Sequence, residues 1–234
     1  MIESILPGAV TAVDTFVDPP GADLFPEEEA VVRKAVDKRR REFTTARWCA
    51  RQAMRQIGIA PAPVLPGTRG EPQWPFGMVG SITHCAGYRA AVLAEQEKVT
   101  TVGIDAEPNE ALASGVLEAV SLTEERDRIA VLLRDHPGVA WDRMLFSAKE
   151  SVYKAWFPLT ARWLDFEDAN IVIDPLNGTF NATLLVTGPW VHGRRLSGFS
   201  GRWLVEQGLV VTAITVLAPV VPKTRPAGRL AAHR

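Results

Sequence analysis

Two carboxylates, Asp105 and Glu107, stand two positions apart in the sequence GIDAEP. The apolar residues before them predict a β-strand that ends near Asp105. Side chains at positions i and i+2 of an extended chain point the same way, so both carboxylates should face one point. Such a pair repels itself unless a cation lies between the two groups, and carboxylate oxygens suit a hard divalent ion such as Mg²⁺. On this segment alone, a solvated acidic turn remains the favoured alternative.

A third carboxylate, Glu150, lies in a segment whose apolar residues recur with helical spacing. Phe146, Glu150 and Tyr153 fall at positions i, i+4 and i+7 and so share one face of the predicted helix. Lys149 and Lys154 flank this face, and a carboxylate between two lysines is unusual for a purely solvated surface. An exposed face with local Lys–Glu pairs is an equally good interpretation of this segment taken alone.

Arginines 47, 51 and 55 recur every four residues and therefore share one face of an earlier helix. Three like charges on one face are destabilising unless something offsets them. A multiply charged phosphate ligand would do so, because the planar guanidinium fork binds phosphate well. The run of basic residues 38–41 is different, because consecutive residues point around a helix, and it is interpreted mainly as a solvated face.

A glycine-rich loop, residues 67–80, leads into three polar residues, Ser81, Thr83 and His84, at the end of a strand. Glycines allow a backbone to approach a ligand closely, and Arg69 adds a basic group to the loop. A lone histidine is more often a structural residue than a ligand, so His84 carries little weight by itself.

The elements that must position these residues follow from periodicity and from turn residues. A helix is expected from Pro26 to Gly58, and residues 60–76 are rich in proline and form a loop. Strands are expected over 78–83, 88–94 and 99–105, with a turn at 85–87 between the first two.

A second series of elements follows the acidic pair. Ser121 and Glu124 form a capping box that opens a short helix, and a longer helix is expected over 139–157. Its apolar stripe is expected to be core: Trp141, Leu145, Ala148, Val152, Ala155 and Trp156. Strands over 169–173 and 179–186 form one hairpin, and strands over 201–206 and 209–216 form another. The predicted class is therefore α+β with antiparallel sheets, and residues 221–234 are expected to be a mobile tail.

Composition limits the possible functions further. The chain has 234 residues, a net charge of −1 and 47% hydrophobic residues, so it is globular and carries no global basic field for nucleic acid. No apolar run is long enough for a membrane span, and we expect a cytoplasmic monomer.

Taken together, the motifs resemble the Sfp-type 4′-phosphopantetheinyl transferase family, in its short siderophore-synthase-associated and actinobacterial branch. The matching motifs appear in the family's order over roughly residues 38–166. They are RWCAR at 47–51, GEPQWP at 70–75, GSITH at 80–84, GIDAE at 103–107 and FSAKESVYKAW at 146–156.

The resemblance implies a pseudo-twofold fold of two similar α/β halves, residues 1–101 and 102–220, with coenzyme A bound between them. It implies magnesium, or manganese, held by Asp105, Glu107 and Glu150. The contacts to coenzyme A that it implies are Arg47, Arg51, Arg69, Ser81, Thr83, His84, Lys149, Lys154, Tyr153 and Trp163, with Phe146 beside the pantetheine channel. The chain departs from the family's pattern at Pro66, where relatives often carry a basic residue.

The activity implied is transfer of 4′-phosphopantetheine from coenzyme A to a serine of an acyl carrier protein, or of a carrier domain in polyketide or nonribosomal peptide synthases. Lys154 would act near the pyrophosphate, and either Glu150 or a water on the metal would be the base. Two alternatives are a magnesium-dependent phosphohydrolase and a non-catalytic coenzyme A binding module.

Overall fold

The computed structural model describes residues 1–219, and the expected tail, residues 221–234, lies outside the described residues. The first half of the chain contains η1 Ile2–Ile5, β1 Thr11–Thr15, α1 Pro26–Val32, α2 Asp37–Gln56, β2 Met78–Cys85, β3 Tyr88–Glu95 and β4 Val99–Pro108. The second half contains α3 Val116–Val120, α4 Thr123–Asp135, α5 Trp141–Thr160, η2 Phe166–Asp168, β5 Ala169–Asp174, β6 Thr179–Leu184, β7 Trp190–Val191, β8 Arg194–Arg195, β9 Gly198–Glu206 and β10 Leu209–Leu217.

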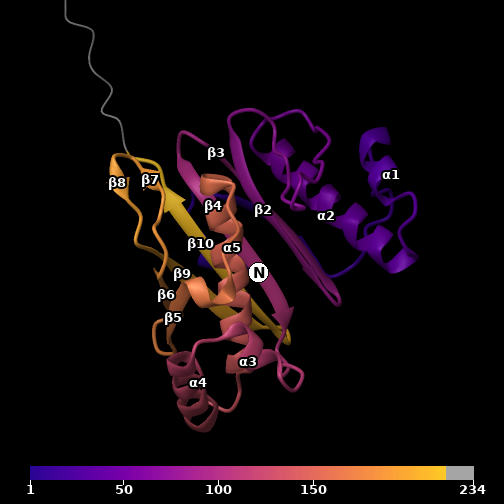
Figure 1. The fold of residues 1–234 in the computed structure, drawn as a ribbon. Helices are drawn as coiled ribbons and strands as arrows, with labels where there is room; N and C mark the ends of the chain where they lie inside the picture. The colour runs from indigo at the N-terminus through magenta and orange to yellow at the C-terminus, as the bar shows by residue number, and fades with distance from the viewer. Residues whose placement is uncertain (220–234) are drawn as a thin grey trace, which may run out of the picture.

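Two large antiparallel sheets, each with a 20-residue helix on one face, build most of the molecule, and β7 and β8 form a small third sheet (Figure 1). The first sheet has the order β1-β3-β2 and carries α2. The second has the order β4-β10-β9-β6-β5 and carries α5. The predicted α+β class is confirmed. The boundary expected after residue 101 falls inside β4, which belongs wholly to the second sheet.

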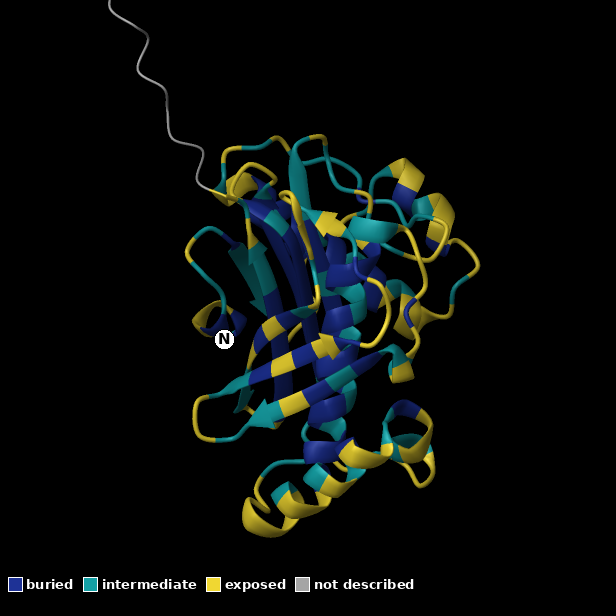
Figure 2. Cartoon of the chain, turned by 60° about the vertical axis from the view of Figure 1, so that its left-hand side comes forward, coloured by how far each residue is buried: buried dark blue, intermediate teal, exposed yellow. Residues whose placement is uncertain are grey.

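Alternation along the strands explains how both faces of each sheet are buried. On β3, Ala91 and Leu93 pack against α2, while Ala90, Val92 and Ala94 face the second sheet. On β10, residues 210 and 214 pack against α5, and residues 209, 211 and 213 face the first sheet. Figure 2 shows the buried residues gathered on the strands and on α5, while α4, at the bottom, is largely exposed.

The prediction of one helix over 26–58 is wrong. The chain turns after α1, and a second helix, α2, begins at Asp37. Glu28 on α1 is fully buried and its carboxylate lies 2.8 Å from the Arg51 guanidinium of α2. In one continuous helix these residues, 23 positions apart, would be separated by about 35 Å. The break therefore allows α1 to fold back beside α2 and join the two side chains.

Other predicted elements are confirmed with shifted ends. The β2–β3 and β9–β10 hairpins, the β5–β6 hairpin and the long helix α5 are all present, and the apolar stripe of α5 is buried. The expected capping box is shifted by one residue, since Glu125 rather than Glu124 accepts the hydrogen bond from the backbone N–H of Leu122, at 2.7 Å. No helix among residues 1–219 is long and apolar enough to cross a bilayer.

The two sheets meet at a seam where β2 and β4 lie side by side (Figure 1). Ser81 Oγ accepts a hydrogen bond from the backbone N–H of Ile104 at 3.1 Å, and Thr83 Oγ1 accepts one from that of Ala106 at 3.0 Å. Two hydroxyl side chains of β2 thus accept hydrogen bonds from backbone N–H groups at the edge of β4. In a continuous sheet, the carbonyls of a neighbouring strand would accept these bonds.

Candidate active site

A cavity of about 870 Å³ opens between the two halves of the chain. Its walls come from α2, from the proline- and glycine-rich loop before β2, from β2 and β4, and from α5. Residues of three predicted motifs line it: Arg47, Arg69, Ser81, His84, Glu150, Tyr153 and Lys154. Residues as far apart in the sequence as Arg47 and Lys154, 107 positions, therefore share one site.

One wall is basic and comes from α2. Arg47 is 7% exposed, its guanidinium lies 3.6 Å above the Phe43 ring, and its Nε donates to the Val64 carbonyl at 3.1 Å. Burial lowers the pKa of Arg47 to about 10, so it remains charged at neutral pH. A buried arginine that faces a cavity is a strong site for a phosphate group.

His84 lies beside this wall at the end of β2. Its Nε2 is 2.9 Å from Nη1 of Arg39 and 3.6 Å from the Glu42 carboxylate. Burial, followed by the neighbouring Arg39 charge, lowers the pKa of His84, so the ring is neutral and accepts the arginine hydrogen bond. Arg39 also lines the cavity, although its run of consecutive basic residues predicted only a solvated face.

Arg51 is turned away from the cavity. The residue is 6% exposed, and its guanidinium pairs with Glu28 and donates to the Asp23 carbonyl. Glu28 also accepts from the Val64 N–H at 2.8 Å, so the pair connects α1, α2 and the loop that leads toward Arg69. The structure thus gives Arg51 internal partners in place of the expected ligand contact.

The opposite wall comes from α5, and Asp105, which does not itself line the cavity, meets this wall through Lys154. Asp105 is 5% exposed, and its Oδ1 accepts from Lys154 Nζ at 2.8 Å and from Thr83 Oγ1 at 3.2 Å. Lys154 also donates to the Ile104 carbonyl at 3.1 Å. The second oxygen of Asp105, Oδ2, is buried and has no hydrogen-bond partner among residues 1–219.

The other two acidic residues both lie close enough to Asp105 for its charge to act on them. Glu107 Oε2 is 3.0 Å from Nη1 of Arg143, and burial, then the Asp105 charge, raises the pKa of Glu107. Glu150 makes no hydrogen bond or ion pair within residues 1–219, and burial raises its pKa, with Lys154 opposing this shift and Asp105 adding to it.

These carboxylates fit a divalent cation by donor chemistry. Among the described residues no three acidic, histidine or cysteine side chains already form a metal-binding group, and Glu107 is paired with Arg143. The unpartnered buried oxygen of Asp105 is nevertheless an acceptor without a donor, which a bound cation would satisfy. Asp105 and Glu150 are therefore the residues best placed to hold one.

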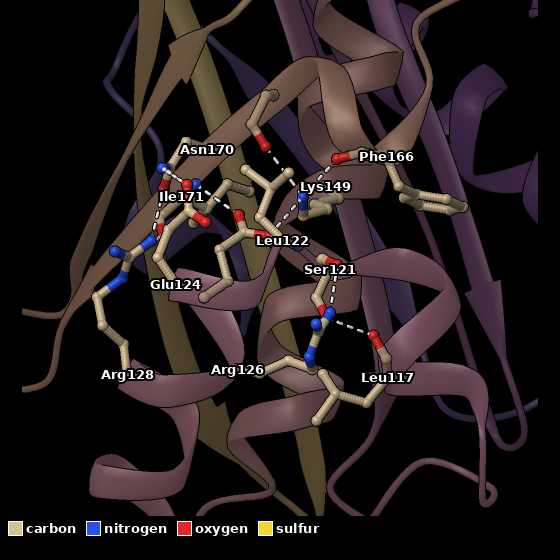
Figure 3. Close-up of polar contacts among 12 residues, drawn as sticks. Leu117, Ser121, Leu122, Glu124, Arg126, Arg128, Lys149, Phe166, Asn170 and Ile171 are labelled. Atoms are coloured by element: carbon tan, nitrogen blue, oxygen red, sulfur yellow. Dashed lines mark hydrogen bonds and ion pairs between the residues drawn. The ribbon is translucent and has the colours of Figure 1, made fainter.

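Lys149 belongs to a separate buried network (Figure 3). Its Nζ is 2.8 Å from the Glu125 carboxylate of α4 and donates to the carbonyls of Phe166 and Ala169. With 4% exposure and three partners, this lysine joins α5 to α4 and to the start of β5. The expected contact of Lys149 with a nucleotide is not available in this arrangement.

Aromatic side chains gather near the C-terminus of α5, where Tyr153 and Phe157 line the cavity and Trp163, which does not line it, packs on Tyr153. The rings of Tyr153 and Trp163 are 5.1 Å apart, and the Arg69 guanidinium lies 5.8 Å from the Trp163 ring. Tyr153 Oη is buried without a partner among the described residues, so it can bond to a polar ligand atom. Phe146 packs on Phe166 at 5.9 Å and does not line the cavity.

Comparison with known proteins identifies the family. Residues 27–94 match the model of the 4′-phosphopantetheinyl transferase N-terminal domain, and residues 101–197 match that of the 4′-phosphopantetheinyl transferase superfamily. The chain belongs to this family. Its members move the phosphopantetheine arm of coenzyme A to a carrier protein, and this protein is a transferase of that type.

Individual relatives cover nearly the whole transferase. The chain is 54% identical over 222 residues to the 4′-phosphopantetheinyl transferase Svp of Streptomyces mobaraensis, covering 94% of this chain and 90% of Svp. It is 49% identical over 225 residues to PptT of Mycobacterium tuberculosis, covering 92% of this chain and 98% of PptT. A more distant match, 34% identical over 125 residues, is enterobactin synthase component D of Salmonella typhi, covering 53% of this chain and 51% of that protein.

Several residues that line the transferase cavity carried no distinct signal in the sequence. Arg39 lies among the four consecutive basic residues 38–41, so the sequence did not distinguish it from its neighbours. Trp74 belongs to the GEPQWP motif but was not predicted to be a site residue, and its ring lies so close to Gly80 that any side chain there would overlap it. Gln96, which lies in the turn between β3 and β4, shows no motif at all. Only the tertiary arrangement brings these three residues to one surface.

Proposed function

We propose that this transferase uses Mg²⁺, or Mn²⁺, to move phosphopantetheine from coenzyme A to a carrier serine within the cavity between its two halves. The observation that supports this most directly is the buried, unpartnered Asp105 Oδ2 beside Lys154 and Glu150. In a transferase that handles a pyrophosphate, such an acceptor is best explained by a cation.

The basic wall is proposed to bind the nucleotide end of coenzyme A. Arg39, Arg47 and His84 offer two guanidinium groups and a ring nitrogen at one end of the cavity. Ser81 and Thr83 support this wall indirectly, since their hydroxyls are engaged with β4. Arg69, the basic group of a loop that has Pro66 at its start, adds a further positive charge at the mouth.

The acidic wall is proposed to carry out the transfer. The carrier serine Oγ forms a bond to the phosphorus that bears pantetheine, and the bond from that phosphorus to the bridging pyrophosphate oxygen breaks, releasing adenosine 3′,5′-bisphosphate. Glu150 accepts the serine proton. Lys154 Nζ offsets the negative charge on the leaving phosphate.

When bound, the divalent ion supplies positive charge at the pyrophosphate oxygens, held by Asp105 and Glu150 with Glu107 nearby. Tyr153, Phe157 and Trp163 are proposed to guide the pantetheine arm, because they offer an apolar wall with one free hydroxyl.

The carrier substrates are proposed to be acyl carrier proteins or carrier domains of polyketide and nonribosomal peptide synthases. The likeness to enterobactin synthase component D supports a siderophore or nonribosomal peptide setting. We further propose that the enzyme acts as a cytoplasmic monomer.

The test is incubation of the protein with coenzyme A, Mg²⁺ and an apo carrier protein, followed by carrier mass measurement. The expected result is the addition of one phosphopantetheine, lost in excess EDTA and restored by Mg²⁺. Full transfer in EDTA would contradict the metal assignment. Release of phosphate or of adenosine 3′,5′-bisphosphate without a carrier would instead support a hydrolase.

A further inference from the structure

A carboxylate, Glu42, stands among the basic residues of the wall that α2 forms. It lines the cavity together with Arg39, Arg47 and His84, and it is 9% exposed. Its carboxylate forms no hydrogen bond within residues 1–219, and its Oε2 lies 3.6 Å from Nε2 of His84. An acidic side chain at this place is unexpected in a wall that is otherwise suited to phosphate groups.

The basic neighbours of Glu42 do not offset its charge by direct pairing. The His84 ring is neutral, because burial and the Arg39 charge lower its pKa, and its Nε2 accepts from Nη1 of Arg39 at 2.9 Å. Arg47 donates through its Nε to the Val64 carbonyl and lies on the Phe43 ring. A carboxylate shielded from water in this way needs a donor, and the cavity is the direction from which a ligand can supply one.

The charges on this wall determine which part of a nucleotide can meet Glu42. A phosphate cannot, because two anions repel each other, whereas the guanidinium groups of Arg39 and Arg47 suit it well. Arg39 Nη1 and Glu42 Oε2 approach the same ring nitrogen of His84, so the cation and the carboxylate are close together. The ligand must therefore carry a phosphate and a hydrogen-bond donor on neighbouring atoms.

The ribose of coenzyme A has this pair of groups, a 3′-phosphate and a 2′-hydroxyl on adjacent carbons. In dinucleotide-binding sites a carboxylate likewise accepts from a ribose hydroxyl, and an arginine accommodates a phosphate on the ribose. The carboxylate of Glu42 and the guanidinium of Arg39 would recognise the two groups separately.

We propose that Glu42 is a specificity-determining residue that accepts a hydrogen bond from the ribose 2′-hydroxyl of coenzyme A, while Arg39 and Arg47 hold the 3′-phosphate, an assignment that rests on the proposed nucleotide role of the basic wall. The charge of Glu42 also repels a phosphate at the 2′ position. Glu42 thereby distinguishes coenzyme A from its isomer that carries the ribose phosphate on the 2′ oxygen.

The experiment measures dissociation constants of the full chain by isothermal titration calorimetry, with coenzyme A and with its 2′-deoxy analogue. The wild type should bind the analogue roughly tenfold more weakly, because a bond to a charged acceptor is lost. Glu42→Met, which keeps the length of the side chain and removes both acceptors, should bind the two ligands equally. Glu118→Met, the same substitution at an exposed position on α3, is the control and should keep the wild-type difference.

Two further ligands separate charge from hydrogen bonding and ribose from base. The isomer with a 2′-phosphate should bind poorly to the wild type and several fold better to Glu42→Gln, which loses the charge but retains an acceptor. An analogue with hypoxanthine in place of adenine lacks the 6-amino donor and should bind the wild type like coenzyme A. A loss with this analogue in place of the 2′-deoxy analogue would overturn the assignment to the ribose.

A purely structural role of Glu42 predicts a different pattern. If Glu42 only holds Arg39 and His84 in place, Glu42→Met should weaken binding of coenzyme A and of its 2′-deoxy analogue by the same factor, and this result would overturn the proposal. Coenzyme A binding that Arg39→Gln and Arg47→Ala still weaken would then leave the nucleotide role of the basic wall standing. Unchanged binding in both arginine variants would overturn that role and the proposal together.

Discussion

Lys154 and Asp105 are joined across the contact between α5 and β4 by a 2.8 Å ion pair, which occupies only one oxygen of the carboxylate. The pair can form because the helix lies directly on the strand at Gly103. A Cβ at this position would overlap the Ser151 carbonyl oxygen and lie 2.7 Å from the Ala155 backbone nitrogen. The closeness of α5 to β4 thus determines where the lysine meets the acidic wall.

Gly103→Ala should separate α5 from β4 and lower both stability and activity. The added methyl group meets helix backbone that cannot rotate away, so we expect a loss of about 1–3 kcal/mol in the free energy of unfolding. Turnover should fall further than the folded fraction, because Lys154 is displaced from Asp105. Urea unfolding and carrier modification measure the two effects. Gly138→Ala, with open space around its Cβ position, is the matched control and should change neither.

Arg47→Ala should mainly raise the KM for coenzyme A. The lost phosphate contact lies far from the reacting phosphorus, so binding should weaken by about 1.5–3 kcal/mol while saturated turnover changes little. Initial rates of carrier modification at varied coenzyme A concentration measure this. An unchanged KM would remove Arg47 from the proposed nucleotide wall.

Arg51→Met should act on stability instead. It leaves Glu28 buried without its cation, and breaking a buried pair in this way costs about 3–5 kcal/mol. The double variant Glu28→Gln with Arg51→Met should recover part of the loss. Urea denaturation gives the free energies. A KM effect of Arg51→Met like that of Arg47→Ala, without loss of stability, would restore Arg51 to the ligand site.

Glu150→Gln should reduce turnover at least about 100-fold, because an amide can neither accept the serine proton nor hold a cation well. Since Glu150 bonds to no other group within residues 1–219, the melting temperature should change by no more than about 2 °C. Glu118→Gln, on the exposed surface of α3, serves as the control. Retained turnover in Glu150→Gln would assign the proton transfer to another group.

His84 should make stability depend on pH in a defined direction. Its pKa is lowered in the folded chain, by burial first and then by Arg39, so the unfolded chain binds the proton more tightly. Its contribution is therefore fully present above the unfolded pKa of about 6.5 and is lost as pH falls through the folded pKa. Melting temperatures between pH 8 and pH 5 should fall more steeply for the wild type than for His84→Gln. His136→Gln, an exposed position at the end of α4, should follow the wild type.

Local patterns predicted those elements whose burial repeats along the chain. The apolar stripe on α5 has a helical period, and two of the hairpins combine alternating apolar and polar side chains with Asn-Gly or Gln-Gly turns. A short segment of sequence is therefore enough to predict each of these elements. The break after α1 has no such signal, because no glycine or proline marks residues 33–36. It follows from the tertiary pair between Glu28 and Arg51.

In the candidate site too, some residues could be predicted from local sequence and others could not. Asp105, Glu150, Lys154 and Arg47 were recognisable because their spacing and family motifs agree with their places in the structure, where three of them line the cavity and Asp105 is paired with Lys154. Lys149 was not, since its buried partner Glu125 lies on another helix, 24 positions earlier, and spacing alone cannot tell a ligand lysine from a buried ion pair. The role of a charged residue such as Lys149 can be assigned only when the structure shows which groups it contacts.

The seam at Ser81 and Thr83 also determines how the molecule bears mechanical load. Within the second sheet, a force along the strands is resisted by a ladder whose bonds act together. Across the seam, the hydroxyls of β2 hold the edge of β4 one bond at a time. The cavity is lined by both of these strands, so a force that separates β2 from β4 would also widen the substrate pocket.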